Sequence, residues 1–413
     1  MIADKWIDSI LKVCDKVEQE NPIENQLVSL LVEKCFAKKE VPEGGVGLVF
    51  ASAFDLLISA EYYGSLSHTG WLYCPDNEPR LFFHYTNCCP RHVIEDKFFF
   101  HPSNKPTSGK IGTATSRLLL LFLKGIFKFK NLKEEILKGT EPVDAIIVNR
   151  ETKQILFAEI KASPLLTLAV SMKAERLTSE VEGEIVANGH MTITNSKLYL
   201  SPIDLWIPVA IEGRWESRHF KLGQKNDEKD FYWGFRGMID LLENDAEFFD
   251  CYFEYWLESF NSYSPKSNKN IFWLTNACGT PTPIPEGWQK RRVGSGYESI
   301  SDSKTSVGMD RTDDIKKGIY QVLKLGSEGK PFSATWDYKV GIISNIHPAR
   351  HFDDYLKSLK DIVWTNDETG RAKFVKDLPD DQKIYNLFDG IIALTKSYSR
   401  DEWIDKLFSN FTL

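Results

Sequence analysis

Apolar positions change their spacing several times along the chain, and each change predicts a different kind of element. In residues 1–40 they recur every three or four residues, which predicts helix. Residues 48–100 mix short apolar and aromatic runs with proline and asparagine, which indicates an irregular or strand-rich subdomain. Residues 111–138 return to a helical spacing and predict one long helix that Gly139 closes.

Two strongly apolar segments follow, and their spacing of two is typical of strands. Residues 143–148 and 154–161 carry almost only apolar side chains, and the polar stretch 149–153 separates them. Strands of this composition are normally buried on both faces of a sheet. We therefore expect this pair near the centre of the fold.

The remaining pattern predicts elements around this pair. Strands are expected at residues 204–211, 271–276 and 339–345, helices at 313–325 and 351–361, and a long loop rich in proline, glycine and serine at 279–308. The predicted class is therefore α/β (an α+β mixed sheet flanked by helices). The expected parts are an N-terminal helical and irregular subdomain (1–110), a core in two pieces (111–163 and 271–361), a large insertion (164–270) and a C-terminal helical tail (362–413).

Composition narrows the class of protein. The 413 residues are 42% hydrophobic and carry a net charge of −7, which allows a large core and excludes a uniformly cationic coat protein of nucleic acid. The longest apolar run, at 118–123, is far shorter than the ~20 residues of a membrane span. Seven sparse cysteines and an N-terminus unlike a secretory signal favour the cytoplasm. No membrane partner is expected from these short apolar runs, and the absence of a Walker-type phosphate motif makes ATP an unexpected partner.

Three charged residues stand out in the apolar strand pair: Asp144, Glu159 and Lys161. If residues 150–153 form a hairpin loop, Asp144 lies directly opposite Glu159, on the face that Lys161 shares. Carboxylates this close repel each other unless a cation lies between them, and Mg²⁺ suits such a pair. Lys161 would then orient a metal-activated water or stabilise negative charge that develops on a phosphate. The simpler alternative is a structural ion pair between Lys161 and one carboxylate.

Pro142-Val143-Asp144, followed by Glu159-Ile160-Lys161 on the next strand, resembles the active site of the PD-(D/E)XK nucleases, of which type II restriction endonucleases are the largest group. The resemblance implies a restriction-endonuclease-like core. It also implies that Asp144 and Glu159 bind one or two Mg²⁺ ions and that Lys161 is the catalytic lysine. A further metal ligand would come from the preceding helix, at Glu134 or Glu135. Val143 separates the proline from the aspartate, which departs from the family pattern at its weakest position.

By this resemblance the chain would be a cytoplasmic, sequence-specific, Mg²⁺-dependent endonuclease from a bacterium or archaeon. Such enzymes usually cut double-stranded DNA as homodimers, because the two-fold symmetry of the protein matches a palindromic site. Two alternatives stay open: a DNA repair or defence nuclease with the same site, and a non-catalytic DNA-binding or scaffolding protein. The strongest rival for the site itself is Asp337 with Lys339, at the start of a predicted strand.

Two further clusters are candidates for binding. Cys89 and His92 have the short ligand spacing of a zinc knuckle, and Cys74 or His84 would complete the set. No paired Cys-x-x-Cys is present, so a core of free cysteines is favoured over structural Zn²⁺.

Basic residues in and after the long loop are candidates for contact with the DNA backbone, and a solvated loop is the alternative. These residues are Lys290, Arg291, Arg292, Lys304 and Arg311.

Overall fold

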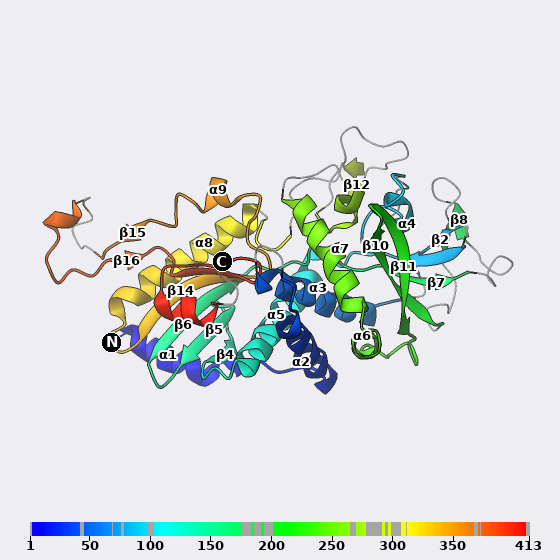
Figure 1. The fold of residues 1–413 in the computed structure, drawn as a ribbon. Helices are drawn as coiled ribbons and strands as arrows, with labels where there is room; N and C mark the ends of the chain where they lie inside the picture. The colour runs from blue at the N-terminus through cyan, green and yellow to red at the C-terminus, as the bar shows by residue number, and fades with distance from the viewer. Residues whose placement is uncertain are drawn as a thin grey trace.

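The structure is a computed structural model with two parts that lie side by side, each built around a seven-stranded sheet (Figure 1). It describes residues 2–41, 45–67, 69–75, 78–97, 99, 103–174, 183–185, 191–193, 201–264, 270–277, 291–293, 296–298, 307–310, 312–366, 371 and 373–409. The mixed α/β class with helices flanking a mixed sheet is confirmed.

The first sheet is mixed and contains the predicted apolar strand pair. Its strands in spatial order are β1 (Asp15–Lys16), β4 (Glu135–Lys138), β5 (Ala145–Asn149), β6 (Gln154–Ile160), β14 (Asp337–Ser344), β17 (Gly390–Ala393) and β18 (Tyr398–Ser399). β14 runs parallel to β6 and to β17, and the other neighbours are antiparallel. β6 therefore lies at the junction between the antiparallel and the parallel part of the sheet.

Helices cover both faces of the first sheet. Ile146 and Phe157 pack with α1 (Ile2–Val13) and α8 (Thr312–Gly329), whereas Ile147 and Leu156 belong to the hydrophobic cluster of α5 (Ser108–Phe129). Successive side chains of a strand point to opposite faces, so this division follows from the sequence. Burial of β5 and β6 on both faces is confirmed.

The second sheet is antiparallel throughout. Its spatial order is β11 (Arg214–Gly223), β10 (Ile203–Ile211), β7 (Val170–Lys173), β3 (Arg80–Phe83), β2 (Trp71–Cys74), β9 (Met191–Ile193) and β8 (Gly183–Ile185). The sheet packs with α6 (Trp233–Asn244) and α7 (Phe248–Tyr263). It therefore combines β2 and β3 of the expected N-terminal subdomain with strands of the expected insertion, whereas α1 and β1 of that subdomain belong to the first sheet's part.

A layer of helices lies between the two sheets. The prediction of an irregular or strand-rich segment from residue 48 onward is wrong in this layer. α2 (Pro22–Ala37) and α3 (Val46–Gly64) pack on each other and on α5, so residues 48–64 are helical rather than irregular. α3 is buried on nearly all sides, and a helix of this kind has no amphipathic period to detect. By length and composition α3 is apolar enough to cross a membrane, but 89% of that window is buried inside the structure, as in a core helix.

Other predicted elements differ in extent or in kind. The helix expected over 111–138 ends at Phe129, and the chain then enters β4, whose four residues are too few to show a strand period. Residues 271–276 contain a 3-10 helix, η2 (Asn270–Leu274), instead of a strand. Residues 351–361 contain only the short helix α9 (Phe352–Tyr355) and turns. The strands expected at 204–211 and 339–345 and the helix at 313–325 are confirmed as β10, β14 and α8.

The expected helical tail is mainly strands and loops. Its described part contains β15 (Val363–Trp364), η5 (Val375–Asp377), β16 (Tyr385–Asn386), β17, β18 and one short α-helix, α10 (Glu402–Leu407). β17 and β18 complete the first sheet, so the C-terminal segment belongs to the fold of that part. β15 and β16 form an arm that projects away from the sheet (Figure 1).

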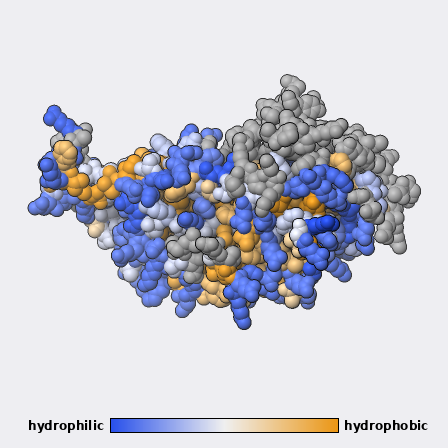
Figure 2. Space-filling model, turned by 45° about the horizontal axis from the view of Figure 1, so that its top comes forward, coloured by the Kyte–Doolittle hydropathy of each residue, from blue (hydrophilic) through white to orange (hydrophobic). Residues whose placement is uncertain are grey.

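This arm carries exposed hydrophobic side chains. Figure 2 shows hydrophobic residues along its length. The large ones that are exposed there are Ile362, Val363, Phe374, Val375 and Ile384. Contiguous apolar surface of this kind often marks an interaction site.

Asp55 on α3 predicts a pH-dependent stability. It is buried, and its Oδ2 accepts hydrogen bonds from the backbone N of Leu166 at 2.9 Å and from Trp256 Nε1 at 2.8 Å. Burial raises the pKa of Asp55 from 3.8 to about 8. Between these values the unfolded chain releases the proton that the folded chain keeps, so the free energy of unfolding should fall with rising pH, by at most ~1.4 kcal/mol per unit.

Urea unfolding of the wild type and of Asp55→Asn between pH 4 and pH 8 measures this effect. The asparagine keeps an accepting oxygen but has no proton to lose, so its stability should vary less over this range. An equal slope in both proteins would show that Asp55 does not titrate as described.

Candidate active site

The β5–β6 hairpin has the predicted register. Ala145 pairs with Ala158, and the next position along each strand sets Asp144 opposite Glu159. The backbone N of Asp144 donates to the carbonyl oxygen of Ala158 at 3.2 Å, and the backbone N of Ile160 donates to Asp144 Oδ2 at 2.9 Å. The Asp144 carboxylate is therefore held at the end of β5 and faces β6.

Lys161 contacts the second carboxylate. Its Nζ lies 2.5 Å from Glu159 Oε1, and the two side chains are 19% and 14% exposed. The backbone N of Lys161 donates to the carbonyl oxygen of Ile343 on β14 at 2.9 Å, and Thr115 Oγ1 on α5 donates to the carbonyl oxygen of Ala162 at 3.0 Å. The structure thus brings Asp144, Glu159 and Lys161 together at one end of the sheet.

The charges of the three residues do not balance. Burial raises the pKa of Glu159, the neighbouring Asp144 raises it further, and the hydrogen bond from Lys161 opposes both effects. The contact between Lys161 and Glu159 is what a structural ion pair also predicts. Asp144 adds a second carboxylate beside the Lys161–Glu159 pair, which is already neutral, so the three side chains together carry excess negative charge. A divalent cation is the kind of ligand that compensates this excess.

Asp144 and Glu159 line a cleft of about 970 Å³. Its walls come from the segment between α1 and α2, from α5, from the turn after β4 and from α8. The polar lining residues besides these two are Asp15, Lys16, Glu18, Gln19, Glu20, Thr113, Ser116, Arg117, Lys138, Glu141 and Gln321. The cleft therefore combines carboxylates with basic and neutral hydrogen-bonding groups.

The N-terminal wall of the cleft was missed by sequence reasoning. β1 pairs with β4, with Asp15 opposite Lys138, and this pairing brings the segment 15–20 beside the hairpin. Arg117 on α5 fixes the far end of this segment, since its Nε lies 3.2 Å from Glu20 Oε1 and its Nη1 lies 2.9 Å from Glu24 Oε2. A two-residue strand gives no periodic signal, so nothing in the sequence pointed to Asp15, Glu18 or Glu20.

The expected third carboxylate is not at this site. Glu135 lies on β4 opposite Val148, not on a helix, and pairs with Arg150 at 3.1 Å. Glu134 accepts a hydrogen bond from Asn149 Nδ2 at 3.0 Å. Glu135 is four strand positions from the level of Asp144, or about 13 Å along the strand. The other carboxylates that line the cleft are those of Asp15, Glu18, Glu20 and Glu141.

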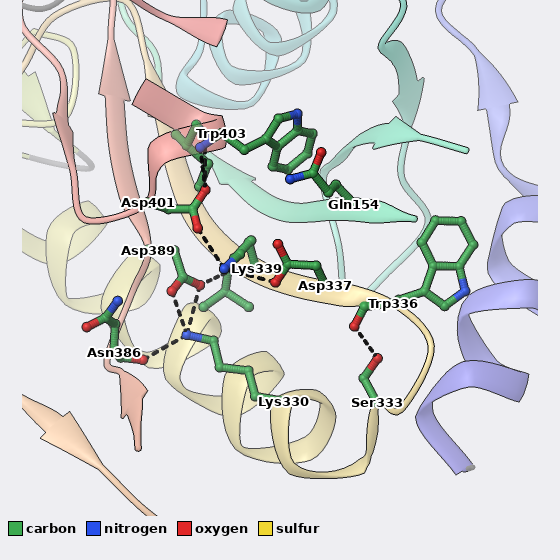
Figure 3. A network of polar contacts seen from close by, with 12 residues as sticks. Gln154, Lys330, Ser333, Trp336, Asp337, Lys339, Asn386, Asp389, Asp401 and Trp403 are labelled. Carbon is green, nitrogen blue, oxygen red and sulfur yellow. Dashed lines mark hydrogen bonds and ion pairs between the residues drawn. The ribbon is translucent and has the colours of Figure 1, made fainter. Parts of the chain in front are cut away.

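The rival pair belongs to a structural network at the other end of the sheet (Figure 3). Lys339 Nζ lies 2.9 Å from Asp337 Oδ1 and 2.6 Å from Asp401 Oδ2, so its charge is shared between two acids. Asp337 is level with Gln154 at the start of β6, whereas Glu159 is level with Ile342. These strand positions separate Asp337 from the level of Glu159 by about 17 Å along the strand.

The predicted DNA-contacting residues lie largely outside the described part of the chain. This holds for Lys290, Lys304 and Arg311, while Arg291 and Arg292 are described only as backbone of β12 (Arg291–Val293), which pairs with β13 (Gly296–Glu298). Their role in binding stays a prediction.

The candidate zinc ligands come together in the second part of the molecule. Ligand atoms of Cys74, Cys89 and His92 lie within 4.8 Å of one another, and all three residues are buried. His84 is not in this group, and burial lowers the pKa of its ring to about 4. The favoured interpretation, a core of free cysteines, stays a prediction, and so does the zinc site.

Comparisons with family models, with curated proteins and with solved structures gave no match to the chain.

Proposed function

We propose that the chain is a Mg²⁺-dependent endonuclease that cuts double-stranded DNA at specific sequences, in the manner of a type II restriction enzyme. The observation that carries the proposal is that Asp144 and Glu159 face each other and line a cleft, while Lys161 contacts Glu159. A mixed sheet with the hairpin at its centre is compatible with the restriction-endonuclease-like core that the family resemblance implies.

The donor set fits magnesium. Carboxylate oxygens are hard ligands, and Mg²⁺ binds through one or two of them while it keeps several waters. When bound, the ion polarises a phosphoryl oxygen and acidifies a water. Asp144 and Glu159 would hold it, because their carboxylates face each other across the two strands.

Lys161 supplies the positive charge on the protein side. Its ammonium group lies against Glu159 and is held by a backbone that is anchored to β14. Charge that develops on the phosphate in the transition state is stabilised by a donor fixed in advance. Lys16 and Lys138 line the same cleft and are suited to contact neighbouring phosphates of the DNA backbone.

Incubation of bacteriophage DNA with the purified protein and Mg²⁺ tests the proposal. We expect discrete fragments that disappear when EDTA removes the metal. A smear, or nicks only at damaged bases, would favour the repair or defence nuclease instead. DNA binding without cleavage under any metal condition would favour the non-catalytic alternative.

A matched pair of lysine variants makes this test specific to the site. Lys161→Met should lower the cleavage rate about 10²–10³-fold, the usual cost of one transition-state donor. Lys339→Met makes the same change on the neighbouring strand, where Lys339 also pairs with an acid two residues away, Asp337. This variant should cleave DNA at the wild-type rate. Circular dichroism checks that both variants fold. Equal loss in both variants, or in neither, would contradict the proposed site.

Gly139 predicts a second effect on cleavage. A Cβ at this position would overlap the backbone of Val143 and Asp144, and the backbone N of Gly139 donates to the carbonyl oxygen of Asp144 at 2.9 Å. Gly139→Ala should therefore displace Asp144 and slow cleavage about 10²-fold, as a misplacement of about 1 Å commonly does. Gly112→Ala on α5, where the added Cβ meets nothing within 4 Å, is the control. Unchanged cleavage by Gly139→Ala would contradict the role given to this turn.

The proposed enzyme acts as a homodimer, because a palindromic site calls for two-fold symmetry. The exposed apolar side chains of the arm, such as Phe374 and Val375, support a protein partner at that end of the molecule. The molar mass from light scattering, measured on the protein used for cleavage, shows whether the dimer forms.

A further inference from the structure

The second part of the molecule holds a buried set of soft ligands that the nuclease reaction does not use. Cys74 is the last residue of β2, Cys89 directly precedes the short helix α4 (Pro90–Val93), and His92 lies within it. His92 Nδ1 is 3.1 Å from Cys89 Sγ and 3.8 Å from Cys74 Sγ. Two thiols and one imidazole therefore converge on a single point.

These separations, 3.1 Å and 3.8 Å, are close to those of ligands around one zinc ion. With Zn–S near 2.3 Å and Zn–N near 2.0–2.1 Å, a tetrahedral site sets its ligand atoms about 3.5–3.8 Å apart. The three atoms already lie within 4.8 Å of one another, so small side-chain rotations suffice. Thiolate and imidazole are the ligands that zinc prefers, and magnesium takes oxygen instead.

The surroundings also suit bound thiolates. Arg91 is buried, and its Nη1 donates to Cys74 Sγ at 3.7 Å, so a positive group already faces one sulfur. The ring of His92 packs on Phe99, with centroids 4.5 Å apart, and the carbonyl oxygen of Phe99 accepts from the backbone N of Cys89 at 2.9 Å. The two contacts of Phe99 fix the orientation of the His92 ring and of the Cys89 backbone, as residues around the ligands do in metal sites.

We propose that Cys74, Cys89 and His92 bind one structural Zn²⁺ ion that fastens β2 of the second sheet to α4. These three protein ligands leave the fourth position of a tetrahedral ion to water. Binding replaces the protons of the two thiols. The site stands apart from the proposed magnesium site in its residues and in its ligand chemistry, so either can fail without the other.

Metal analysis of the full-length, untagged protein tests this proposal. We expect about one zinc per chain in the wild type after dialysis, and strong loss in Cys74→Ser, Cys89→Ser and His92→Gln. Cys88→Ser is the matched control, because Cys88 is a buried cysteine next to Cys89 but is not in the cluster, and it should keep its zinc. Asp144→Asn should also keep it, since that residue belongs to the other metal site.

A second measurement on the wild type covers the case in which a ligand variant does not fold. Replacement of zinc by Co²⁺ should give the charge-transfer absorption of cobalt–thiolate bonds, and a chelator that removes the metal should lower the melting temperature. Wild-type protein without stoichiometric zinc, or Cys89→Ser with full zinc, would overturn the proposal. Three neutral side chains linked by weak hydrogen bonds would then be the correct description.

Discussion

Asp144→Asn and Glu159→Gln should each lower the rate of Mg²⁺-dependent DNA cleavage by about 10³-fold, because loss of a metal ligand removes several kcal/mol of transition-state stabilisation. Both substitutions keep the size of the side chain and remove one negative charge. The hydrogen bond from the backbone N of Ile160 to Asp144 Oδ2 can still form in the asparagine variant. Single-turnover cleavage at saturating enzyme measures the effect on the chemical step.

DNA binding provides the internal check on this prediction. A gel-shift assay in Ca²⁺ should show that both variants bind DNA about as well as the wild type, since the substitutions touch the metal rather than the DNA contacts. Asp337→Asn is the matched control, because it makes the same change on the neighbouring strand in the structural network of Figure 3. Wild-type cleavage by either site variant would remove the basis of the proposed mechanism.

Lys330→Met should lower the free energy of unfolding by about 3–5 kcal/mol, the usual cost of removing one partner of a buried ion pair. Lys330 and Asp389 are 4% and 5% exposed, and their charged atoms lie 2.8 Å apart. Asp389 also accepts a hydrogen bond from the backbone N of Val340 at 2.8 Å, so it cannot easily turn away (Figure 3). The variant would leave a carboxylate buried without its counter-charge.

Urea unfolding of a double-mutant cycle measures this cost. Lys330→Met with Asp389→Leu should recover much of the loss, because no uncompensated charge remains. Lys133→Met, which breaks the exposed pair with Glu151, should have little effect. A Lys330→Met protein as stable as the wild type would show that the pair does not carry the stability given to it.

The hairpin could be predicted because its evidence is local. β5 and β6 are next to each other in sequence, four loop residues join them, and their alternation fixes which side chains share a face. Asp144, Glu159 and Lys161 follow from that register without knowledge of the rest of the fold. The cleft that Asp144 and Glu159 line could not be predicted in this way, because Asp15–Lys16 on β1 and Gln321 on α8 also form it.

Distant pairing decides the surroundings of other candidate residues, and the sequence alone does not show that pairing. The residues before Glu135 have the apolar spacing of a helix, yet Glu135 itself lies on β4. Pairing with β5 decides the conformation of that short segment. Cys74 and Cys89 meet only because β2 belongs to a sheet and α4 packs beside it. Spacing along the chain therefore named them as possible zinc ligands but could not show that they meet.

Anomalous diffraction from crystals soaked in Mn²⁺ tests the central claim most directly, since manganese takes the oxygen ligands of magnesium and can be located by its scattering. We predict a strong peak between the carboxylates of Asp144 and Glu159, with Lys161 beside it. The claim would be contradicted if the protein cleaves DNA but its crystals show manganese elsewhere, with the ion pair between Lys161 and Glu159 intact.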